Sequence, residues 1–359
     1  MSDRFLNFNF IMDYDKLLES LPTSLIGAIA RIDELKGRWI GGCDLSPRTV
    51  ENLRRSTLIT SAGASTRIEG SKMTDKDIED YLSGLKIQKF AERDRQEVSG
   101  YHETLELIFN QYQELAWTEN NIKYLHTRLL QYSAKDENHR GNYKTIDNRI
   151  EAVDANGKLI SVIFETTPVY LVGKEMSELI DWSQSAERHH PLLVLSVFTI
   201  SFLKIHPFLD GNSRLSRLLT NQWLLRHGYD YTPFVSHEKL IEDSKADYSR
   251  TLRDSQITFG RADESVGAWT EYFLRILLFQ AQKAVDLLDV TRIEDELSPK
   301  QLALWQYLSR VDQATPGQIS KEIQVARMTV SQALTKLLGL GLIVRLGQGR
   351  TTSYRRRVR

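Results

Sequence analysis

The sequence predicts a mainly α-helical protein with one β-hairpin and a small C-terminal domain of different composition. Apolar residues recur at helical spacing through most of the chain. Asn156-Gly157 separates two short runs of β-branched and apolar residues, which is a strong signal for a hairpin turn. After residue 297 the charged residues are mostly basic. The windows with helical periodicity are residues 15–38, 47–68, 97–115, 175–182, 191–205, 237–253 and 269–288.

Capping residues mark the starts of two further helices. Thr74 precedes Asp77 by three residues, and Thr118 precedes Asn121 by the same spacing. A threonine at the N-cap accepts a hydrogen bond from a backbone N–H of the first turn, so both threonines are expected to begin helices. His126 lies on the apolar side of the second helix. We expect it to be a core residue, and we assign it no catalytic role.

The length of 359 residues is enough for two or three domains. We expect an N-terminal helical region at residues 1–95, a helical core at residues 96–290 and a C-terminal domain at residues 297–359. Residues 291–296 are mostly charged, and we expect them to form a linker.

The composition excludes several classes of protein. Lys plus Arg and Asp plus Glu both number 47, so the net charge gives no sign that the whole chain binds nucleic acid or membranes. Cys43 is the only cysteine, which excludes an intrachain disulfide and suits a reducing compartment. We see no signal peptide after Met1, and the apolar run at 191–205 is too short to span a membrane. We therefore expect a cytoplasmic protein that makes no membrane contact.

The segment from His206 to Arg217, here called the signature loop, combines residues that suit a phosphate site. Gly211 and Asn212 tolerate unusual backbone angles and so suit a tight loop. A helical pattern begins directly after them, with Leu215 and Leu218 on its apolar side. A loop that leads into a helix N-terminus directs several backbone N–H groups at one point, where an anion can bind.

The charged residues of the signature loop point to the same chemistry. Arg214 and Arg217 lie three residues apart, so both can face one side of the helix and bind a polyphosphate. Asp210 offers an oxygen ligand, and Mg²⁺ is commonly held by one carboxylate together with substrate phosphates. His206 can act as a general base near neutral pH. The alternative is a structural histidine beside a surface-exposed basic helix.

The signature loop resembles the Fic family signature H-x-F-x-[D/E]-G-N-G-R-x-x-R and departs from it only at Ser213, where glycine is usual. The resemblance implies a helical Fic domain that uses ATP and Mg²⁺ and transfers AMP to a Ser, Thr or Tyr hydroxyl of a protein. It implies His206 as the base, Phe208 as the loop anchor, Asp210 as the Mg²⁺ ligand, and Gly211, Asn212, Ser213, Arg214 and Arg217 as the ATP-binding residues.

Ser213 is the position where this sequence differs from the family. Its Cβ would cause strain if the backbone there needed a positive φ. Independently of the backbone, the Cβ could crowd the phosphates. Its hydroxyl could instead donate a hydrogen bond to a phosphate oxygen. We expect a working site with altered efficiency.

The segment from Ser65 to Gly70 has two interpretations. By itself it is a helix end with a glycine after it. It also resembles [S/T]-x-x-x-E-[G/N], the inhibitory motif of self-inhibited Fic proteins, through Ser65, Glu69 and Gly70. That resemblance implies that Glu69 pairs with Arg217 and takes the space that the γ-phosphate of ATP needs.

Further expectations concern the partners of the site. The predicted hairpin, at about residues 150–164, is either a surface hairpin or the Fic flap, which holds the target segment by main-chain pairing. Tyr229 and Tyr248 could stack on adenine or pack in the core. Homodimers are common among Fic proteins, so a homodimer is a further expectation.

The C-terminal region resembles a winged helix-turn-helix. From Ser298 onward there are eleven Lys or Arg and only two acidic residues, Asp312 and Glu322, a formal charge of +9. Helical patterns at 300–308, 316–323 and 326–338 precede two strand-like runs at 343–346 and 351–354. A basic helix-turn-helix is typical of DNA binding, and contacts to another protein are the alternative. The candidate DNA contacts are Arg327, Thr329, Ser331, Gln332, Lys336 and Arg350, with Arg355–Arg357 in the wing or tail.

Two classes of function therefore compete. The first is a self-inhibited protein adenylyltransferase with an appended winged helix. The second is a DNA-binding regulator whose Fic domain senses nucleotide. Some Fic proteins transfer UMP or phosphocholine, or remove AMP, and these reactions stay open.

Overall fold

The structure is a computed structural model that describes residues 13–19, 21–84, 91–153, 159–261, 263–295, 297–347 and 352–356, without the side chains of residues 150–163 and 289–295. The chain divides into two compact units, Met1–Val285 and Asp286–Arg359. The expected N-terminal region and helical core thus belong to one unit.

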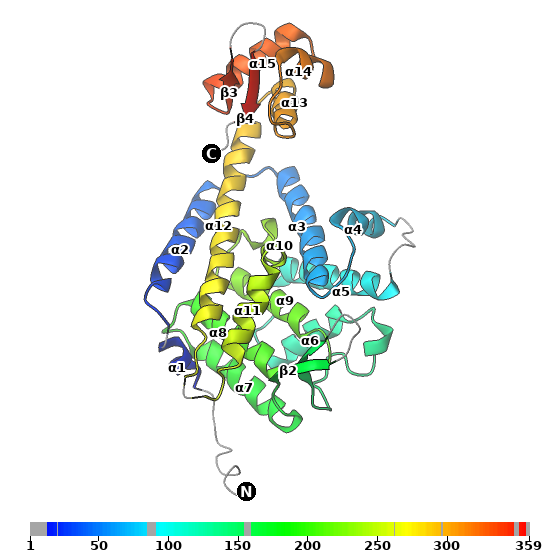
Figure 1. Cartoon of the computed structure of the whole chain (residues 1–359), viewed down its shortest axis with the longest axis vertical. Coiled ribbons are helices and arrows are strands. Elements are labelled where there is room, and N and C mark those ends of the chain that lie inside the picture. Colours follow the sequence, from blue (N-terminus) through cyan, green and yellow to red (C-terminus); the bar gives the residue numbers. More distant parts are fainter. Residues whose placement is uncertain are drawn as a thin grey trace, which may run out of the picture. The chain divides into compact units, whose positions relative to one another are not determined.

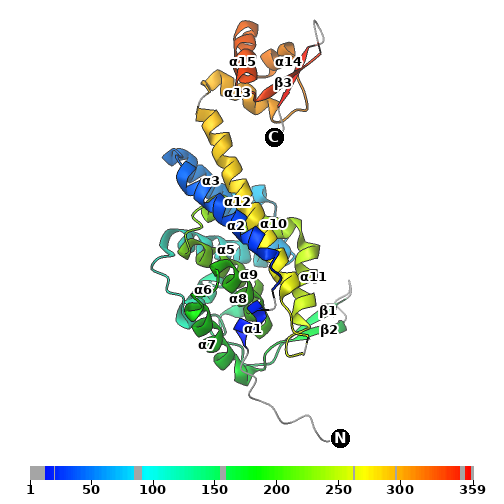
Figure 2. The same cartoon turned by 90° about the vertical axis from the view of Figure 1, so that its left-hand side faces the viewer.

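The first unit is mainly helical, as predicted (Figures 1 and 2). Two short 3-10 helices, Ala134–Asp136 and Thr232–Phe234, join longer elements. The α-helices are α1 (Tyr14–Glu19), α2 (Leu25–Gly42), α3 (Pro47–Ile68), α4 (Asp75–Leu82), α5 (Glu92–Gln111), α6 (Glu119–Leu129), α7 (Val169–Ser185), α8 (Pro191–Ile205), α9 (Asn212–Arg226), α10 (His237–Asp243), α11 (Lys245–Gln256) and α12 (Gly267–Asp295), whose residues from Asp286 onward belong to the second unit.

Several helical boundaries differ from the prediction. Helix α5 spans Glu92–Gln111 rather than 97–115, and α7 spans Val169–Ser185 rather than 175–182. The window at 15–38 is two helices, because Pro22 lies between them and lacks the N–H that a continuous helix needs. The window at 237–253 is divided at Ser244. Helix α12 continues to Asp295, so the predicted linker at 291–296 is helical over most of its length. The charge of these residues suggested a linker, but arginine and glutamate also have a high helix propensity, and here the helix forms.

The centre of the first unit is formed by α8 and α9. Helix α8 is buried on nearly all sides, which accounts for its almost continuous apolar sequence. It packs against α7, α9 and α11. Helix α3 packs against α5, α9 and α10. The C-terminal end of α3, which carries the Ser65–Gly70 segment, thereby lies beside α9.

The predicted hairpin is confirmed by strand pairing. Strand β1 (Arg149–Val153) pairs antiparallel with β2 (Leu159–Glu165), with Arg149 opposite Glu165 and Val153 opposite Leu159. Two register irregularities interrupt the ladder. The predicted turn, Asn156-Gly157, lies outside the described residues.

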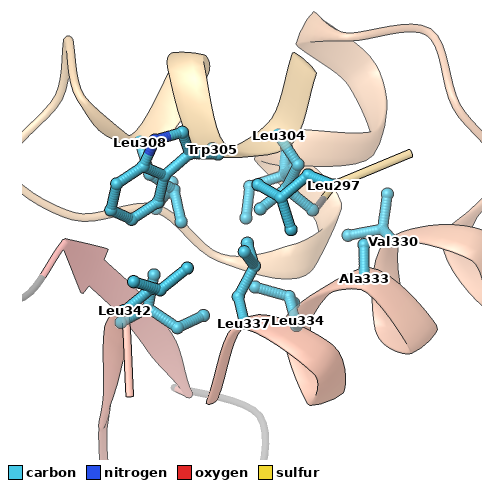
Figure 3. Close-up of a cluster of buried hydrophobic side chains, with 12 residues drawn as sticks. Leu297, Leu304, Trp305, Leu308, Val330, Ala333, Leu334, Leu337 and Leu342 are labelled. Carbon is cyan, nitrogen blue, oxygen red and sulfur yellow. The ribbon is translucent and has the colours of Figure 1, made fainter. Parts of the chain in front are cut away.

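The second unit contains three helices and a two-stranded sheet. Helices α13 (Pro299–Leu308), α14 (Pro316–Glu322) and α15 (Arg327–Gly339) precede strands β3 (Ile343–Leu346) and β4 (Ser353–Arg356), which pair antiparallel. In Figure 3 apolar side chains of α13 face those of α15. This core includes Leu304, Trp305, Leu308, Val330, Ala333, Leu334, Leu337 and Leu342.

No helix in the described part of the chain is both long enough and apolar enough to cross a membrane.

Gly100 provides a test of the packing between α5 and α6. A Cβ at this position would lie 2.0 Å from the carbonyl oxygen of Leu129, and a backbone carbonyl cannot rotate away. We expect Gly100→Ala to lower the free energy of unfolding by at least about 2 kcal/mol. Urea denaturation measures this change.

Gly37 is the matched control. It lies within α2, and apart from its chain neighbours and the nearby backbone of that helix, no described atom lies within 4 Å of the place that a Cβ would take. Gly37→Ala should stabilise the protein by about 0.5–1 kcal/mol, because alanine has the higher helix propensity. Equal stability changes in the two variants would contradict the close approach at Gly100.

Candidate active site

The signature loop connects α8 to α9 and has an unusual backbone. His206 follows the last residue of α8 in the left-handed conformation, with φ 52°, and its N–H donates to the carbonyl of Phe202 at 2.9 Å. Gly211 also has a positive φ, 81°, directly before α9. A left-handed conformation is uncommon for a residue other than glycine, and the two buried helices hold His206 in it.

The side chain of Asn212 closes the loop. Its Oδ1 accepts from the N–H of Phe208 at 3.0 Å, and its Nδ2 donates to the Phe208 carbonyl at 2.8 Å. Both polar atoms of the Asn212 amide group thus form hydrogen bonds to the backbone of Phe208. What Asn212 can offer to a phosphate is its backbone N–H at the start of α9.

His126 contacts the signature loop through Phe208 and Asp210. The sequence did not suggest this supporting role. It is fully buried, and its ring stacks on Phe208 with 3.8 Å between centroids. Its Nδ1 accepts from the N–H of Gly141 at 2.8 Å, so the proton is on Nε2, which donates to the Asp210 carbonyl at 3.0 Å. Burial lowers the pKa of His126 to about 4, so the ring is neutral near pH 7.

The carboxylate of Asp210 is fully engaged. Its Oδ1 accepts from the N–H of Gly211 at 2.6 Å and from Nη2 of Arg214 at 2.9 Å. Its Oδ2 accepts from Nζ of Lys135 at 2.7 Å. Burial opposes ionisation, but Arg214 and Lys135 outweigh it and hold the pKa of Asp210 well below its usual range. The carboxylate is therefore anionic, as a metal ligand must be, and Lys135 would have to leave for a cation to bind Oδ2.

The two arginines of the signature loop are buried, so the alternative of a surface-exposed basic helix is wrong. The side chains of Arg214 and Arg217 are 3% and 2% exposed. Nη1 of Arg214 lies 3.4 Å from Oε1 of Glu97. Buried guanidinium groups need anionic partners.

Arg217 contacts Glu69, the residue that the resemblance pairs with it, and also contacts Ser65, for which no contact was predicted. Its Nη2 donates to Oε1 of Glu69 at 2.9 Å and to the carbonyl of Ser65 at 3.0 Å, and its Nε donates to Oγ of Ser65 at 2.8 Å. Gly70, with φ 108°, ends the turn after α3. Glu69 remains 32% exposed, so it is more accessible than the arginine that it covers.

Ser213 has an ordinary helical backbone. Among the described residues, His206 and Gln324 are the non-glycine positions with positive φ. The condition for strain at Ser213 is therefore not met. Within the described part of the chain no side chain caps α9, so the N–H groups of its first turn stay available to an anion.

The imidazole of His206 is held in its neutral form. Burial lowers its pKa to about 4, and the charge of Lys144 acts in the same direction. Asp210 and Glu69 oppose this shift more weakly. A neutral imidazole can accept a proton, as a general base must.

Lys144 links the hairpin to the signature loop and was not predicted. Its Nζ donates to Oδ1 of Asn148 at 2.8 Å, to Oγ1 of Thr166 at 2.7 Å and to the carbonyl of Ile205 at 3.3 Å. Asn148 and Thr166 directly precede β1 and follow β2. The base of the hairpin is thereby fastened beside His206.

The two candidate nucleoside contacts are both buried, which favours the alternative of core packing. The hydroxyl of Tyr229 donates to Oδ1 of Asp33 at 2.9 Å, and Lys36 lies over its ring. Tyr248 packs against Trp269 and Tyr272.

The candidate DNA contacts lie in the second unit. Arg327, Ser331, Gln332 and Lys336 are exposed on α15, and Thr329 is half-buried. Arg350 and Arg357 lie outside the described residues. In β4, Arg355 is exposed, and Arg356 is half-buried over the ring of Trp305.

Part of the chain is similar in sequence to a known protein family and to two of its relatives. The model of the Fic/DOC family matches residues 116–224. The protein adenylyltransferase Fic of Drosophila willistoni is 41% identical over 56 residues, 15% of this chain and 11% of that relative. A probable protein adenylyltransferase of Aquifex aeolicus is 31% identical over 78 residues, 22% of this chain and 24% of that relative. The matches thus span less than a quarter of the length of these curated relatives.

A solved structure shares the fold over nearly the whole chain. The crystal structure of a Fic family protein from Desulfovibrio desulfuricans G20 superposes with a TM-score of 0.63 at 22% identity, covering 95% of this chain and 98% of that one. The family match includes α8 and nearly all of α9, which flank the signature loop. The chain therefore contains a Fic/DOC family domain, with His206, Asp210, Arg214 and Arg217 on its signature loop.

Proposed function

We propose that this protein transfers AMP from ATP to a hydroxyl group of a target protein, and that Glu69 holds it in an inhibited state. The observation that carries the proposal is the position of Arg217. This buried cation lies on the signature loop helix, and its guanidinium is occupied by the carboxylate of Glu69 rather than by a phosphate.

The first turn of α9 and the two arginines fit a polyphosphate. The uncapped helix N-terminus offers backbone N–H groups, and Arg217 keeps its Nη1 without a hydrogen-bond partner among the described residues. Asp210 would hold a Mg²⁺ ion that neutralises phosphate charge when ATP is bound. The described residues form no group of three or more typical metal ligands, so the nucleotide and water would complete the coordination.

His206 would act as the base in this reaction. The target hydroxyl attacks the α-phosphorus of ATP, and its proton passes to the imidazole. A new O–P bond forms, the bond from the α-phosphorus to the bridging oxygen breaks, and pyrophosphate leaves. The lowered pKa keeps the imidazole neutral before the reaction, and Lys144 holds the adjoining backbone in place.

The hairpin of β1 and β2 is the proposed binding site for the target. Its base is fixed beside His206 by Lys144, so an extended target segment paired with a strand edge would present a hydroxyl near the base. Main-chain pairing selects an extended conformation rather than a sequence. Transfer of another nucleotide, or removal of AMP, would use the same residues.

A second candidate function is DNA binding by the second unit. The exposed face of α15 carries Arg327, Gln332 and Lys336, and the order of three helices and a hairpin suits a winged helix. This function is compatible with catalysis by the first unit.

Glu69→Gly should raise the rate of AMP transfer. The substitution frees Arg217 for a phosphate, and one guanidinium cannot bind both anions in full geometry. We expect an increase of at least about tenfold, equivalent to about 1.4 kcal/mol. Incorporation of label from α-labelled ATP with Mg²⁺, with the protein alone and with a cell lysate, measures the rate.

The control is the double variant Glu69→Gly/His206→Ala, which keeps the open arginine and lacks the base. It should bind ATP but transfer no label. Equal labelling by wild type and Glu69→Gly would remove the inhibitory role of Glu69. Labelling by the double variant would remove the role of His206 as base.

The rate should depend on pH through His206. Protonation removes the base, and burial places its pKa near 4, so kcat/KM of Glu69→Gly should stay level from pH 8 to about 5.5 and fall below that. Lys144→Met should move the fall to higher pH, because the Lys144 cation lowers the pKa of His206. A fall in kcat/KM centred near pH 6.5 in Glu69→Gly would contradict the buried environment of His206.

Lys336→Glu should weaken binding of duplex DNA by the full chain. A lysine that contacts phosphate contributes about one unit to the slope of log affinity against log salt concentration. The matched control is Lys283→Glu, which changes an exposed lysine of α12 by the same charge. Identical salt slopes for both variants, or no binding by wild type, would exclude α15 as a DNA-binding helix.

A further inference from the structure

A buried carboxylate lies near Arg217 and has no part in the reaction proposed above. Glu238, on α10, is 0% exposed. Four neutral side chains donate hydrogen bonds to it. They are Ser61 at 2.8 Å, Tyr101 at 2.9 Å, Asn221 at 2.7 Å and Ser236 at 2.9 Å.

Glu238 is ionised in this environment. Burial alone would raise its pKa, but hydrogen bonds donated by Ser61 and Asn221 act in the opposite direction, and the pKa of Glu238 lies below its ordinary value. A fully buried carboxylate is costly unless its oxygens are hydrogen-bonded and a cation is near.

Two routes connect Glu238 to Arg217. In the first, Nε of Arg217 donates to Oγ of Ser65, the Ser65 side chain interacts with the hydroxyl of Tyr101, and Tyr101 donates to Oε1 of Glu238. In the second, Nδ2 of Asn221 donates to Oε1 of Glu238 and to the carbonyl of Arg217, at 2.7 and 3.1 Å. The routes join α3, α5, α9 and α10, so four helices are held in one network.

We propose that Glu238 is a positioning residue, a permanent counter-charge that keeps the Arg217 guanidinium oriented when Glu69 moves away. This rests on the proposed function, in which ATP displaces Glu69. Ser65 fixes Nε and Nη2 of Arg217, and Tyr101 with Glu238 fixes Ser65. Nη1 is then left to receive a phosphate oxygen in a set direction.

The proposal predicts an effect on one part of the nucleotide. Arg217 pairs with Glu69, which is proposed to take the space of the γ-phosphate. Loss of the Arg217 orientation should therefore weaken binding of ATP and leave binding of AMP unchanged. A residue needed only for folding would weaken both.

The test compares affinities for ATP and for AMP by calorimetry in the Glu69→Gly background. Glu238→Gln keeps the shape of the side chain and removes its charge. We expect about tenfold weaker ATP binding, equivalent to about 1.4 kcal/mol, and AMP binding within about twofold. Tyr101→Phe should act in the same direction. The control is Thr270→Val, which removes a buried hydrogen bond to Ser196 between α8 and α12 and should change neither affinity.

A second measurement needs no nucleotide. In a double-mutant cycle of thermal stability, Glu238→Gln and Arg217→Lys should be coupled, so that the double variant loses less than the sum of the single losses. Additive losses, or an equal fall in ATP and AMP affinity, would overturn the positioning role. If Glu69→Gly transfers no AMP but the cycle shows coupling and ATP binding is selectively weakened, the proposed function fails and the positioning role stands.

Discussion

The burial of the Arg217 charge is the constraint on which the rest of the site depends. A guanidinium that is 2% exposed must be matched by anions and hydrogen-bond acceptors, because water cannot solvate it. Glu69 and Ser65 supply these from the end of α3, and Glu238 supplies a second carboxylate through Tyr101. Polar contacts of Arg217 and Glu238 thus link α3, α5 and α10 to α9. Removal of Glu69 leaves the other contacts in place, which is why the proposed inhibition can be reversible.

The second constraint is the shape of the signature loop. His206 has a left-handed backbone, which costs free energy and persists only where the surroundings enforce it. Asn212 closes the loop from within, and His126 supports it through Phe208 and Asp210. Catalysis by positioning needs such rigidity, because an error of about 1 Å in the placement of the base can cost about a hundredfold in rate.

Two lysines near the signature loop, Lys144 and Lys135, differ in burial and therefore in the role that each can have. Lys144 is buried between the hairpin and the loop, where its charge keeps His206 neutral and its hydrogen bonds fix the backbone. Lys135 is half exposed and covers Asp210, so solvent can replace it at small cost. The site thus combines contacts that should persist during a reaction with contacts that can exchange for a nucleotide and its metal ion.

The sequence by itself determined the structural elements that depend on residues close together in the chain. The spacing of apolar residues predicted α3, α8 and α9, the Asn-Gly pair predicted the hairpin, and the signature residues predicted which loop carries the site. It missed the helix breaks at Pro22 and Ser244, and it misplaced the end of α12 at residues 291–296, where propensity and charge gave opposing signals. Only the tertiary structure decided that His126, Lys135 and Lys144 contact the loop or its end, and that Glu238 lies buried beside α9. Their contacts join segments up to 177 residues apart in the sequence. Burial, which shifts the pKa of an ionisable group and strengthens its electrostatic contacts, arises only when those segments pack together.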